Sequence, residues 1–551
     1  MLHTYKSVKH APSAGKAMRF ELHVLFILFV SIVLGGAIVF AGSRDKLRDG
    51  EEAAASGNDA AARVAKGPRA NTGGLSLIAL AHILRQSAAS AANDLRVNGA
   101  QKVEAANDSA FRISHASSAG ADRDALFPDV AYNPDDNEYL VVWAGNGLAG
   151  ADFRGVKEVF GQRINAATGA SVGAEFRISN MADGGKNRNA GNAQLVYNST
   201  AHEYLIVWNG SGDKSAPDSV FEIYGQRFSR TGSQVGPEFR ISNTTELGKV
   251  ADTFVRASTR PDIAWNSTDN QYLVVWDGMG QPEDTIKTEV YGQLLNAAGG
   301  ALGKNFRISN TTDQGAEFNA SAAVAAYNSI NKQYLVVWSG SSREKSQYEI
   351  WGQGLTAQGA QIGEGKGDFL VSSVTGAGAD RDASAPQIVY SNGSNEYLVV
   401  FHATGMQGAN NTSDVLGQRI NAATLAKVGP SDFRISNGVG PKNMSDNPRV
   451  AYNAPGKEYL VVWRGFRADA PFEIYGQRLG PNGNEIETDF QISNIAAVGK
   501  DRNANLASVA CNSQNGEYLA VWQGDALPGP ANKKVNEIFG LRIKPSSRSR
   551  P

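Results

Sequence analysis

Four short motifs recur in the same order seven times between residue 111 and the end of this 551-residue chain. The clearest, Glu/Gln-Tyr-Leu-x-Val-Trp, ends at an aromatic residue, and successive copies lie 59 to 68 residues apart. These aromatic residues are Trp143, Trp208, Trp276, Trp338, Phe401, Trp463 and Trp522. Self-similarity at a period of about 63 residues means that this part of the chain consists of copies of one structural unit that pack on one another.

The other motifs complete the unit. A Phe-Arg-Ile-Ser motif comes first, an aromatic-Asn step precedes the Tyr-Leu motif, and a Gly-Gln-Arg motif follows it. The fifth Phe-Arg-Ile-Ser copy reads Phe-Leu-Val-Ser, and the last Gly-Gln-Arg copy reads Gly540-Leu541-Arg542. We label the four expected strands A (aromatic-Asn), B (Tyr-Leu-x-Val-Trp), C (Gly-Gln-Arg) and D (Phe-Arg-Ile-Ser).

The side-chain pattern predicts where each strand lies. Both faces of Tyr139–Trp143 are apolar, so strand B should be covered on both sides. Phe-Arg-Ile-Ser alternates apolar and polar residues, which is typical of a half-exposed outer strand. Four to six polar residues, such as those from Asn133 to Glu138, connect A to B, which indicates a hairpin whose Asn is left-handed or forms an Asx turn.

Four-stranded sheets repeated radially make a β-propeller. We therefore predict an all-β fold, a seven-bladed β-propeller of four-stranded antiparallel blades. The chain enters on one D strand and leaves on the C strand Gly540–Ile543, so pairing of residues 111–114 with the last blade would close the ring. A linear β-solenoid is the alternative, and the hairpin-length links argue against it.

These units resemble the Val-Val-Trp/Gly-Gln-Arg repeats of uncharacterised secreted bacterial propeller proteins, and the closure resembles that of WD40 domains. The resemblance covers about residues 111–545 and implies a fold and an exported location, without an activity. The Gly-His and Trp-Asp signatures of WD40 repeats are absent.

The N-terminus has the pattern of a targeting or anchoring segment. Four basic residues within the first 21 precede a run at 24–42 without a charged residue. As a helix, 19 residues span about 28 Å, close to the hydrocarbon core of a bilayer. We expect either a signal anchor with a cytoplasmic N-terminus or a signal peptide cut near Ala41. The protein would then lie at the cell surface, tethered through 24–42, or be secreted.

Composition shifts define three expected regions. Residues 1–43 form the cytoplasmic tip and the anchor or signal peptide, and residues 44–104 form a low-complexity linker with a short helix at 74–95. Residues 105–551 form the propeller. The region at 74–95 contains Leu75–Leu84, which is too short to span a membrane.

Charge and cysteine content exclude several classes of partner. The chain has 53 Lys+Arg against 54 Asp+Glu, so it lacks the basic excess of a nucleic-acid binder. One cysteine, Cys511, excludes an intrachain disulfide framework and a cysteine-based zinc site. It stands where other units have an aromatic residue and should be buried. We expect no metal, no cofactor and a monomer.

One arginine position recurs before strand A and is the candidate ligand site. It is occupied in five units, by Arg123, Arg188, Arg256, Arg381 and Arg502. A ring of planar guanidinium groups near one channel mouth would suit carboxylate or phosphate groups. The other interpretation is a repeated internal network in which each arginine pairs with nearby carbonyl or carboxylate groups. We also interpret the glycines of the Trp-x-Gly steps as turns of unusual φ, and the glutamines of Gly-Gln-Arg as strand-to-strand hydrogen-bonding groups.

No catalytic constellation stands out from the repeats. The D–A and B–C loops open on the same face, and the B–C loop varies most in length and content. We predict a non-enzymatic binding or surface-interaction module that uses this face for a protein or glycan ligand. The alternative is an extracellular carbohydrate-active enzyme, a hydrolase or lyase, using the same face. The places that break the pattern should discriminate between these functions: an insertion at 244–252, Phe318, Asn443 and His402.

Overall fold

The computed structural model describes part of the unit Ala100–Pro551, and the described residues are almost entirely strands and their turns. They are residues 109–115, 124–146, 156–184, 188–211, 221–243, 257–279, 288–310, 319–341, 347–363, 367–374, 381–405, 412–437, 444–466, 471–495, 502–525 and 535–546. The predicted segments at 24–42 and 74–95, and most of the D–A and B–C loops, lie outside this part of the chain.

Three sheets contain four antiparallel strands in chain order. They comprise β2 (Ala125–Asn133), β3 (Glu138–Gly145), β4 (Glu158–Asn165) and β5 (Ser171–Arg177); β6 (Ala190–Asn198), β7 (Glu203–Gly210), β8 (Glu222–Ser229) and β9 (Gln234–Arg240); and β10 (Ser258–Asn266), β11 (Gln271–Gly278), β12 (Glu289–Asn296) and β13 (Ala301–Arg307). A short 3-10 helix, η3 (Met181–Gly184), follows β5.

The next sheets keep this order with local variations. In one, β16 (Tyr348–Thr356) pairs with β17 (Gln361–Ile362) and with β18 (Phe369–Leu370), after β14 (Ala320–Asn328) and β15 (Gln333–Ser341). An eight-stranded sheet joins two antiparallel runs of four through the single parallel pair Ser413↔Met444. Its strands are β19 (Ala383–Ser391), β20 (Glu396–Thr404), β21 (Ser413–Asn421), β22 (Lys427–Arg434), β23 (Met444–Asn453), β24 (Glu458–Phe466), β25 (Glu473–Leu479) and β26 (Glu485–Gln491).

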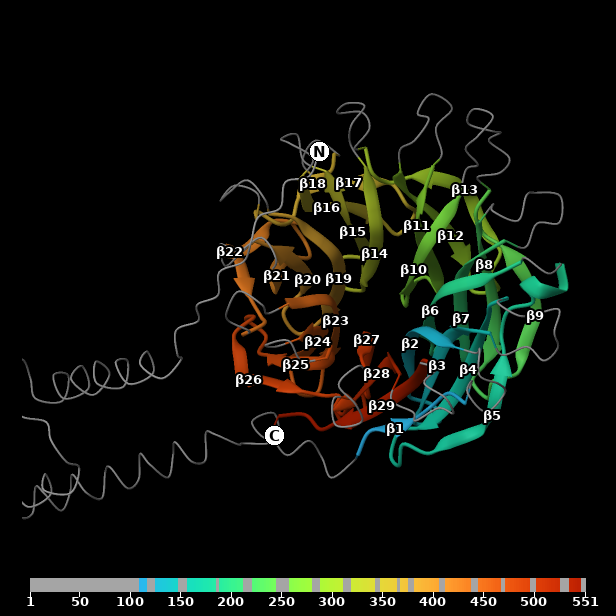
Figure 1. The fold of residues 1–551 in the computed structure, drawn as a ribbon. Helices are drawn as coiled ribbons and strands as arrows, with labels where there is room; N and C mark the ends of the chain where they lie inside the picture. The colour runs from blue at the N-terminus through green and yellow to red at the C-terminus, as the bar shows by residue number, and fades with distance from the viewer. Residues whose placement is uncertain are drawn as a thin grey trace, which may run out of the picture. The chain divides into compact units, whose positions relative to one another are not determined.

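The last sheet combines the two ends of the described chain. The C-terminal strands β27 (Ala504–Cys511), β28 (Tyr518–Gly524) and β29 (Glu537–Ile543) are completed by β1 (Phe111–Arg112), with Phe111 opposite Gly540. Figure 1 shows the sheets arranged around a common axis, with the first strand of each run innermost. The innermost strands are β2, β6, β10, β14, β19, β23 and β27. The fold is therefore all-β and β-propeller-like.

The second strand of each run forms the core, as the sequence pattern predicts. All eight residues of β3 are buried, and Trp208, Trp276 and Trp338 in the equivalent strands have no exposed surface. The connection before β3 is the predicted hairpin, because Asp135 N donates to Asn133 Oδ1 at 2.9 Å and Asn137 has a φ of 52°. Burial of apolar side chains on both faces of these strands supplies the main stabilising term.

The Phe-Arg-Ile-Ser motif does more than form an outer strand. In β5 it supplies only the last two residues, and Ile178 and Ser179 follow the strand with their side chains buried. The Ser179 hydroxyl donates to the buried carboxylate of Glu158 and accepts from Val159 N at 2.8 Å. The same serine–carboxylate pair recurs in every unit, ending with Ser114 and Glu537 in the last sheet. A serine that was expected on an exposed face therefore connects strands C and D inside the protein.

The Gly-Gln-Arg motif connects strands and neighbouring sheets. Gln162 Nε2 donates to backbone carbonyls within its own sheet, as the sequence predicts, at 2.9 Å to Arg163 O and 3.3 Å to Val172 O. Arg163 pairs with Glu138 of β3 at 2.8 Å and donates to Thr231 O of the next sheet at 2.7 Å. Arg542 donates in the same way from the last sheet to Ala167 O of the first. The motif thus has a structural role.

The glycines of the Trp-x-Gly steps do not form turns of unusual φ, so that interpretation is wrong. Gly340 lies within β15 and does not have a positive φ. A Cβ atom there would lie 2.7 Å from Trp351 Cδ1, and one at Gly278 would lie 2.9 Å from Tyr291 Cδ2. At Gly340 and Gly278 glycine is needed because an aromatic ring of strand C packs directly on the backbone, and at Gly210 and Gly524 the side chains of Met181 and Ile495 take this place.

This packing makes a prediction. Gly340→Ala should lower the free energy of unfolding by about 1–3 kcal/mol, because its methyl group has no room beside Trp351. Gly191→Ala is the matched control, since no atom lies within 4 Å of its added methyl group. Chemical denaturation followed by tryptophan fluorescence measures both variants. Equal stability of the two would contradict the role given to Gly340.

Candidate functional site

Every innermost strand has a bulge at the same place. The register between β2 and β3 shifts between Leu126 and Asp129, and the other six pairs of strands shift equivalently. One residue at each bulge has a positive φ of 46° to 56°. These residues are Phe127, Asn192, Arg260, Ala322, Ala385, Asn447 and Leu506. Residues other than glycine rarely adopt this conformation, and a bulge changes the direction of the adjacent side chains.

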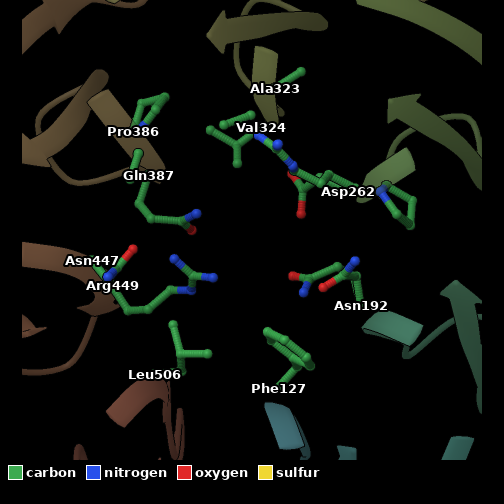
Figure 2. A pocket seen from close by; sticks show the side chains of 15 residues that line it. Phe127, Asn192, Asp262, Ala323, Val324, Pro386, Gln387, Asn447, Arg449 and Leu506 are labelled. Carbon is green, nitrogen blue, oxygen red and sulfur yellow. The ribbon is translucent and has the colours of Figure 1, made fainter. Parts of the chain in front are cut away.

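The bulges surround a cavity of about 330 Å³ on the axis. Residues of all seven innermost strands line it, and the polar lining includes Asn192, Gln194, Asp262, Gln387 and Arg449. Figure 2 shows the side chains of Asp262, Gln387 and Arg449 pointing into the same space. The cavity lies near the ends of the strands that the D–A segments enter.

Asp262 is the carboxyl group in this lining. Burial raises its pKa to about 7, and the nearby charge of Asp129 acts in the same direction. Hydrogen bonds from Ala325 N, at 2.8 Å, and from Ile263 N oppose this shift, as does the charge of Arg449. Asp262 is partly exposed, so a molecule in the cavity can reach it. A reachable carboxyl group with a pKa near neutrality can donate or accept a proton.

Asp129 occupies in β2 the position that Asp262 occupies in β10. It accepts from Ser508 Oγ of the last sheet at 2.7 Å and from Leu195 N of the second sheet at 3.1 Å. Burial raises the pKa of Asp129, and its hydrogen bonds and the charge of Arg449 oppose that rise. Asp129 thus connects three consecutive sheets and contributes negative charge beside the cavity.

A second acidic group supports the cavity from the same sheet as Asp262. Asp277 is buried and accepts from Ala322 N at 2.9 Å and Ala323 N at 3.3 Å. Burial raises its pKa to about 6. Arg260, which lines the cavity, lies 3.6 Å from Asp277. Asp277 therefore holds the bulge of β14 and positions a cation at the cavity wall.

Phe127 gives the cavity an apolar surface. Its side chain is 40% exposed although it is a large hydrophobic residue, and it lines the cavity. Its left-handed backbone is held by the hydrogen bond from Phe127 N to Gln523 Oε1 at 2.8 Å. A strained residue held in place by a neighbouring sheet is a feature of binding sites. Together the lining offers an aromatic face, amide groups, guanidinium groups and a carboxyl group that can transfer protons.

The described arginines of the predicted ligand site, Arg188, Arg381 and Arg502, do not line this cavity. Arg188 Nη1 donates to Ser211 O at 2.9 Å, and Arg502 donates to Asp525 O. Arg188 is buried, Arg381 is partly exposed, and none of these three lines the cavity. Arg123 and Arg256 lie outside the described residues. The hydrogen bonds of Arg188 and Arg502 are of the kind that the internal-network interpretation expects, and ligand binding by the five arginines stays a prediction.

Most of the pattern-breaking positions are not described. The insertion at 244–252, Phe318 and Asn443 lie outside the described residues. His402 Nε2 lies 2.9 Å from Ser384 Oγ, and burial lowers the pKa of His402. Cys511 is half-buried against the core, and burial raises its pKa to about 12. Neither residue lines the axial cavity.

The described residues contain neither a metal site nor a membrane-spanning helix. No group of three or more His, Cys, Asp or Glu residues there is arranged to hold a metal ion. Within the same residues, no helix has the length and apolar character needed to cross a bilayer.

The sequence contained a signal for the cavity residues that the repeat analysis did not use. Three positions before the strand A aromatic residue or Cys511 the repeats have Asp129, Gln194, Asp262, Val324, Gln387, Arg449 and Ser508. Six of these residues are polar, although they belong to the innermost strand of a packed sheet. Polar residues of different chemistry at one inward-facing position of the repeat are not explained by packing, and they indicate a site on the axis.

The pKa of Asp262 predicts a pH-dependent stability. The folded protein holds this proton up to about pH 7, whereas the unfolded chain releases it near the ordinary value of 3.8. The charge therefore destabilises the fold as the pH rises between these values. Asp262→Asn should raise the melting temperature relative to the wild type more at about pH 8 than at about pH 4, because Asn retains an acceptor for Ala325 N. An equal difference at both pH values, measured by circular dichroism, would contradict the shift.

Comparison with known proteins gives distant structural similarities only. No protein-family model matches the sequence, and a search of curated proteins gives no match. A polysaccharide lyase of family PL25, an ulvan lyase, is similar with a TM-score of 0.47 and 8% identity, over 80% of this chain and all of its own. A Hadza microbial sialidase has a TM-score of 0.40 and 9% identity, over 71% of this chain and 73% of its own.

A third similar structure is the GH93 α-L-arabinofuranosidase of Fusarium graminearum. It has a TM-score of 0.39 and 14% identity, over 64% of this chain and 93% of its own. All three are described as glycan-processing enzymes, and on this finding the prediction of a non-enzymatic binding module is corrected. The preference against an enzyme is corrected accordingly. At these TM-scores the likeness transfers no activity to this chain, so an activity has to be argued from the residues of the cavity.

Proposed function

We propose that the protein is a glycan-processing enzyme whose active site is the axial cavity and which hydrolyses a glycosidic bond. The observation that carries the proposal is a reachable carboxyl group, Asp262, in one cavity with an exposed aromatic ring, Phe127, and the amides of Asn192, Gln194 and Gln387. Amide groups donate and accept hydrogen bonds, which suits the hydroxyl groups of a sugar. An exposed aromatic ring offers a flat apolar surface for the C–H face of a sugar ring.

Asp262 would perform the proton transfer. A carboxylic acid of raised pKa protonates the oxygen of the leaving sugar while the C–O bond breaks and positive charge develops on the other sugar. Water then forms the new C–O bond at that carbon, and its released proton goes to the Asp262 carboxylate, which restores the acid. Asp129 does not line the cavity, but its nearby charge raises the pKa of Asp262 and so helps to keep this proton donor protonated.

The finer architecture and the location belong to the same proposal. Counting the four-stranded runs, with β1 completing the last, supports a closed seven-bladed propeller of the repeat type that the sequence resembles. The basic flank and the uncharged run at 24–42 support export, with a retained anchor or with cleavage near Ala41. Sequencing the N-terminus of the exported protein distinguishes these two forms, and a cytoplasmic protein with an intact N-terminus would contradict export.

Substitution of Asp262 tests the activity. Asp262→Asn should lower kcat roughly 10²- to 10⁴-fold on a glycan that the wild type cleaves, because the amide cannot transfer the proton. The wild-type kcat should fall above about pH 7 as Asp262 loses its proton, with Asp129 and Arg449 as the charged groups that set this limit. The measurement is release of reducing ends from a panel of neutral and acidic polysaccharides.

Asp269→Asn provides the matched control. Asp269 lies in the exposed turn at the other end of β10, outside the cavity lining. The control should keep wild-type activity. Cleavage by Asp262→Asn at the wild-type rate, or the absence of cleavage of every glycan by the wild type, would contradict the proposed function.

A further inference from the structure

Arg449 has more hydrogen-bonding capacity than its surroundings use. It occupies the same position in β23 as Asp262 in β10, and Figure 2 shows its guanidinium group in the cavity. Its one hydrogen bond among the described residues is from Nη1 to Pro448 O at 3.2 Å. No carboxylate of the described residues lies within 4.0 Å of it. A guanidinium group has five N–H donors, so most of those of Arg449 are available to a ligand.

Other arginines of the protein are paired with a carboxylate at close range. Arg464, in the neighbouring strand β24, lies 2.7 Å from Asp446 through Nε, and Arg419 lies 2.7 Å from Glu396. Arg449 instead interacts only at longer range with Asp129 and Asp262, whose charges partly offset the effect of burial on its pKa. A cation removed from bulk water without a close partner is costly, so its presence requires a compensating interaction.

The charge of the cavity lining makes an anion the fitting partner. Arg260 supplies a second guanidinium group, which is 60% exposed and only 3.6 Å from the buried Asp277. Burial raises the pKa of Asp262 to about 7, so Asp262 is less negatively charged near neutral pH than an ordinary aspartate. Among the residues that line the cavity, the two guanidinium groups of Arg260 and Arg449 face one carboxyl group, Asp262, while Asp129 and Asp277 lie behind the lining. The planar donor fork of an arginine matches a carboxylate or a sulfate group in two parallel hydrogen bonds.

We infer that the substrate is an acidic glycan, whose carboxylate or sulfate group binds the guanidinium group of Arg449. This inference rests on the proposed function and specifies its substrate class. Gln387, on the neighbouring strand β19, points into the same space and can bind an adjacent hydroxyl group. The substituent held by Arg449 would place the sugar so that its glycosidic oxygen faces Asp262.

Matched pairs of glycans test the inference on the full-length chain. The probes are oligosaccharides of hexuronates with their carboxyl-reduced counterparts, and sulfated galactans with their desulfated counterparts. Each pair shares linkage and length and differs in charge. The variants are Arg449→Gln, which removes the charge, and Arg449→Lys, which keeps the charge without the fork. Arg230→Gln is the control, because Arg230 pairs with Asp136 at 3.0 Å in an exposed turn outside the cavity.

The wild type should cleave the acidic member of one pair faster than its neutral counterpart. The pair concerned identifies the anion as carboxylate or sulfate. Arg449→Gln should raise KM for the acidic member roughly 10- to 100-fold and remove the preference, since a hydrogen-bonded charge contributes about 1.5–3 kcal/mol. Arg449→Lys should recover part of the loss, and Arg230→Gln should match the wild type. Thermal unfolding checks that each variant is folded.

The outcomes separate this inference from the proposed function. Faster cleavage of the neutral glycans by the wild type would overturn the inference of an acidic substrate. A preference for acidic glycans that persists in Arg449→Gln would overturn it as well. Either result would leave the proposed glycosidase function intact. If Arg449→Gln lowers cleavage of the acidic and neutral members equally and shifts the pH profile, Arg449 acts only through the pKa of Asp262. This result would also overturn the inference of an acidic substrate. If no glycan is cleaved, the proposed function fails, and calorimetric binding of the same pairs still decides whether Arg449 selects an anion. An unsaturated product, seen by its ultraviolet absorbance, would retain the acidic substrate and replace hydrolysis by elimination.

Discussion

The bulge in each innermost strand is the constraint on which the site depends. Without a bulge, the innermost strand would continue its backbone hydrogen bonds to the buried second strand along its whole length. Instead, a left-handed residue such as Phe127 or Ala322 interrupts the ladder, and its backbone N–H is bound by a side chain of the preceding sheet. The neighbouring sheets therefore hold the strained residues in place. The same interruption turns polar side chains toward the axis, where packing would otherwise require apolar ones.

Much of the fold could be predicted because it repeats. The apolar pattern of Tyr139–Trp143 identifies a strand buried on both faces, and the Asn133 turn identifies its hairpin. Two local interpretations differ from the structure because each considered the residues of one strand alone. The alternating pattern of Phe-Arg-Ile-Ser suggested that its serine faces solvent, but Ser179 follows the strand and donates a hydrogen bond to Glu158. Gly340 was expected in a turn, but it lies in a strand where the ring of Trp351 occupies the space of a side chain. Both residues are determined by contacts between strands, and the spacing of a motif within one strand carries no information about those contacts.

The candidate site was missed for the complementary reason. A repeat pattern shows the residues that stay constant, whereas the cavity is built from residues that vary at one position of the repeat: Asp262 in β10, Gln387 in β19 and Arg449 in β23. Two of the recurring arginines, Arg188 and Arg502, donate to backbone carbonyls within the fold, at Ser211 O and Asp525 O. The pKa of Asp262 depends on burial and on the nearby charge of Asp129, which lies 133 positions earlier in the chain. Only the arrangement of the sheets around one axis brings these groups together.

The central claim is that the cavity holds a carboxyl group, Asp262, whose pKa is raised by burial to about 7. Its most direct test is a carbon-13 NMR titration of the aspartate carboxyl carbons in the full-length protein, with the Asp262 signal assigned by its loss in Asp262→Asn. The account predicts a titration midpoint at about 7, set by burial and by the charge of Asp129. A midpoint near the ordinary value of 3.8 would mean that Asp262 is ionised throughout the neutral range, and would contradict its role as the proton donor.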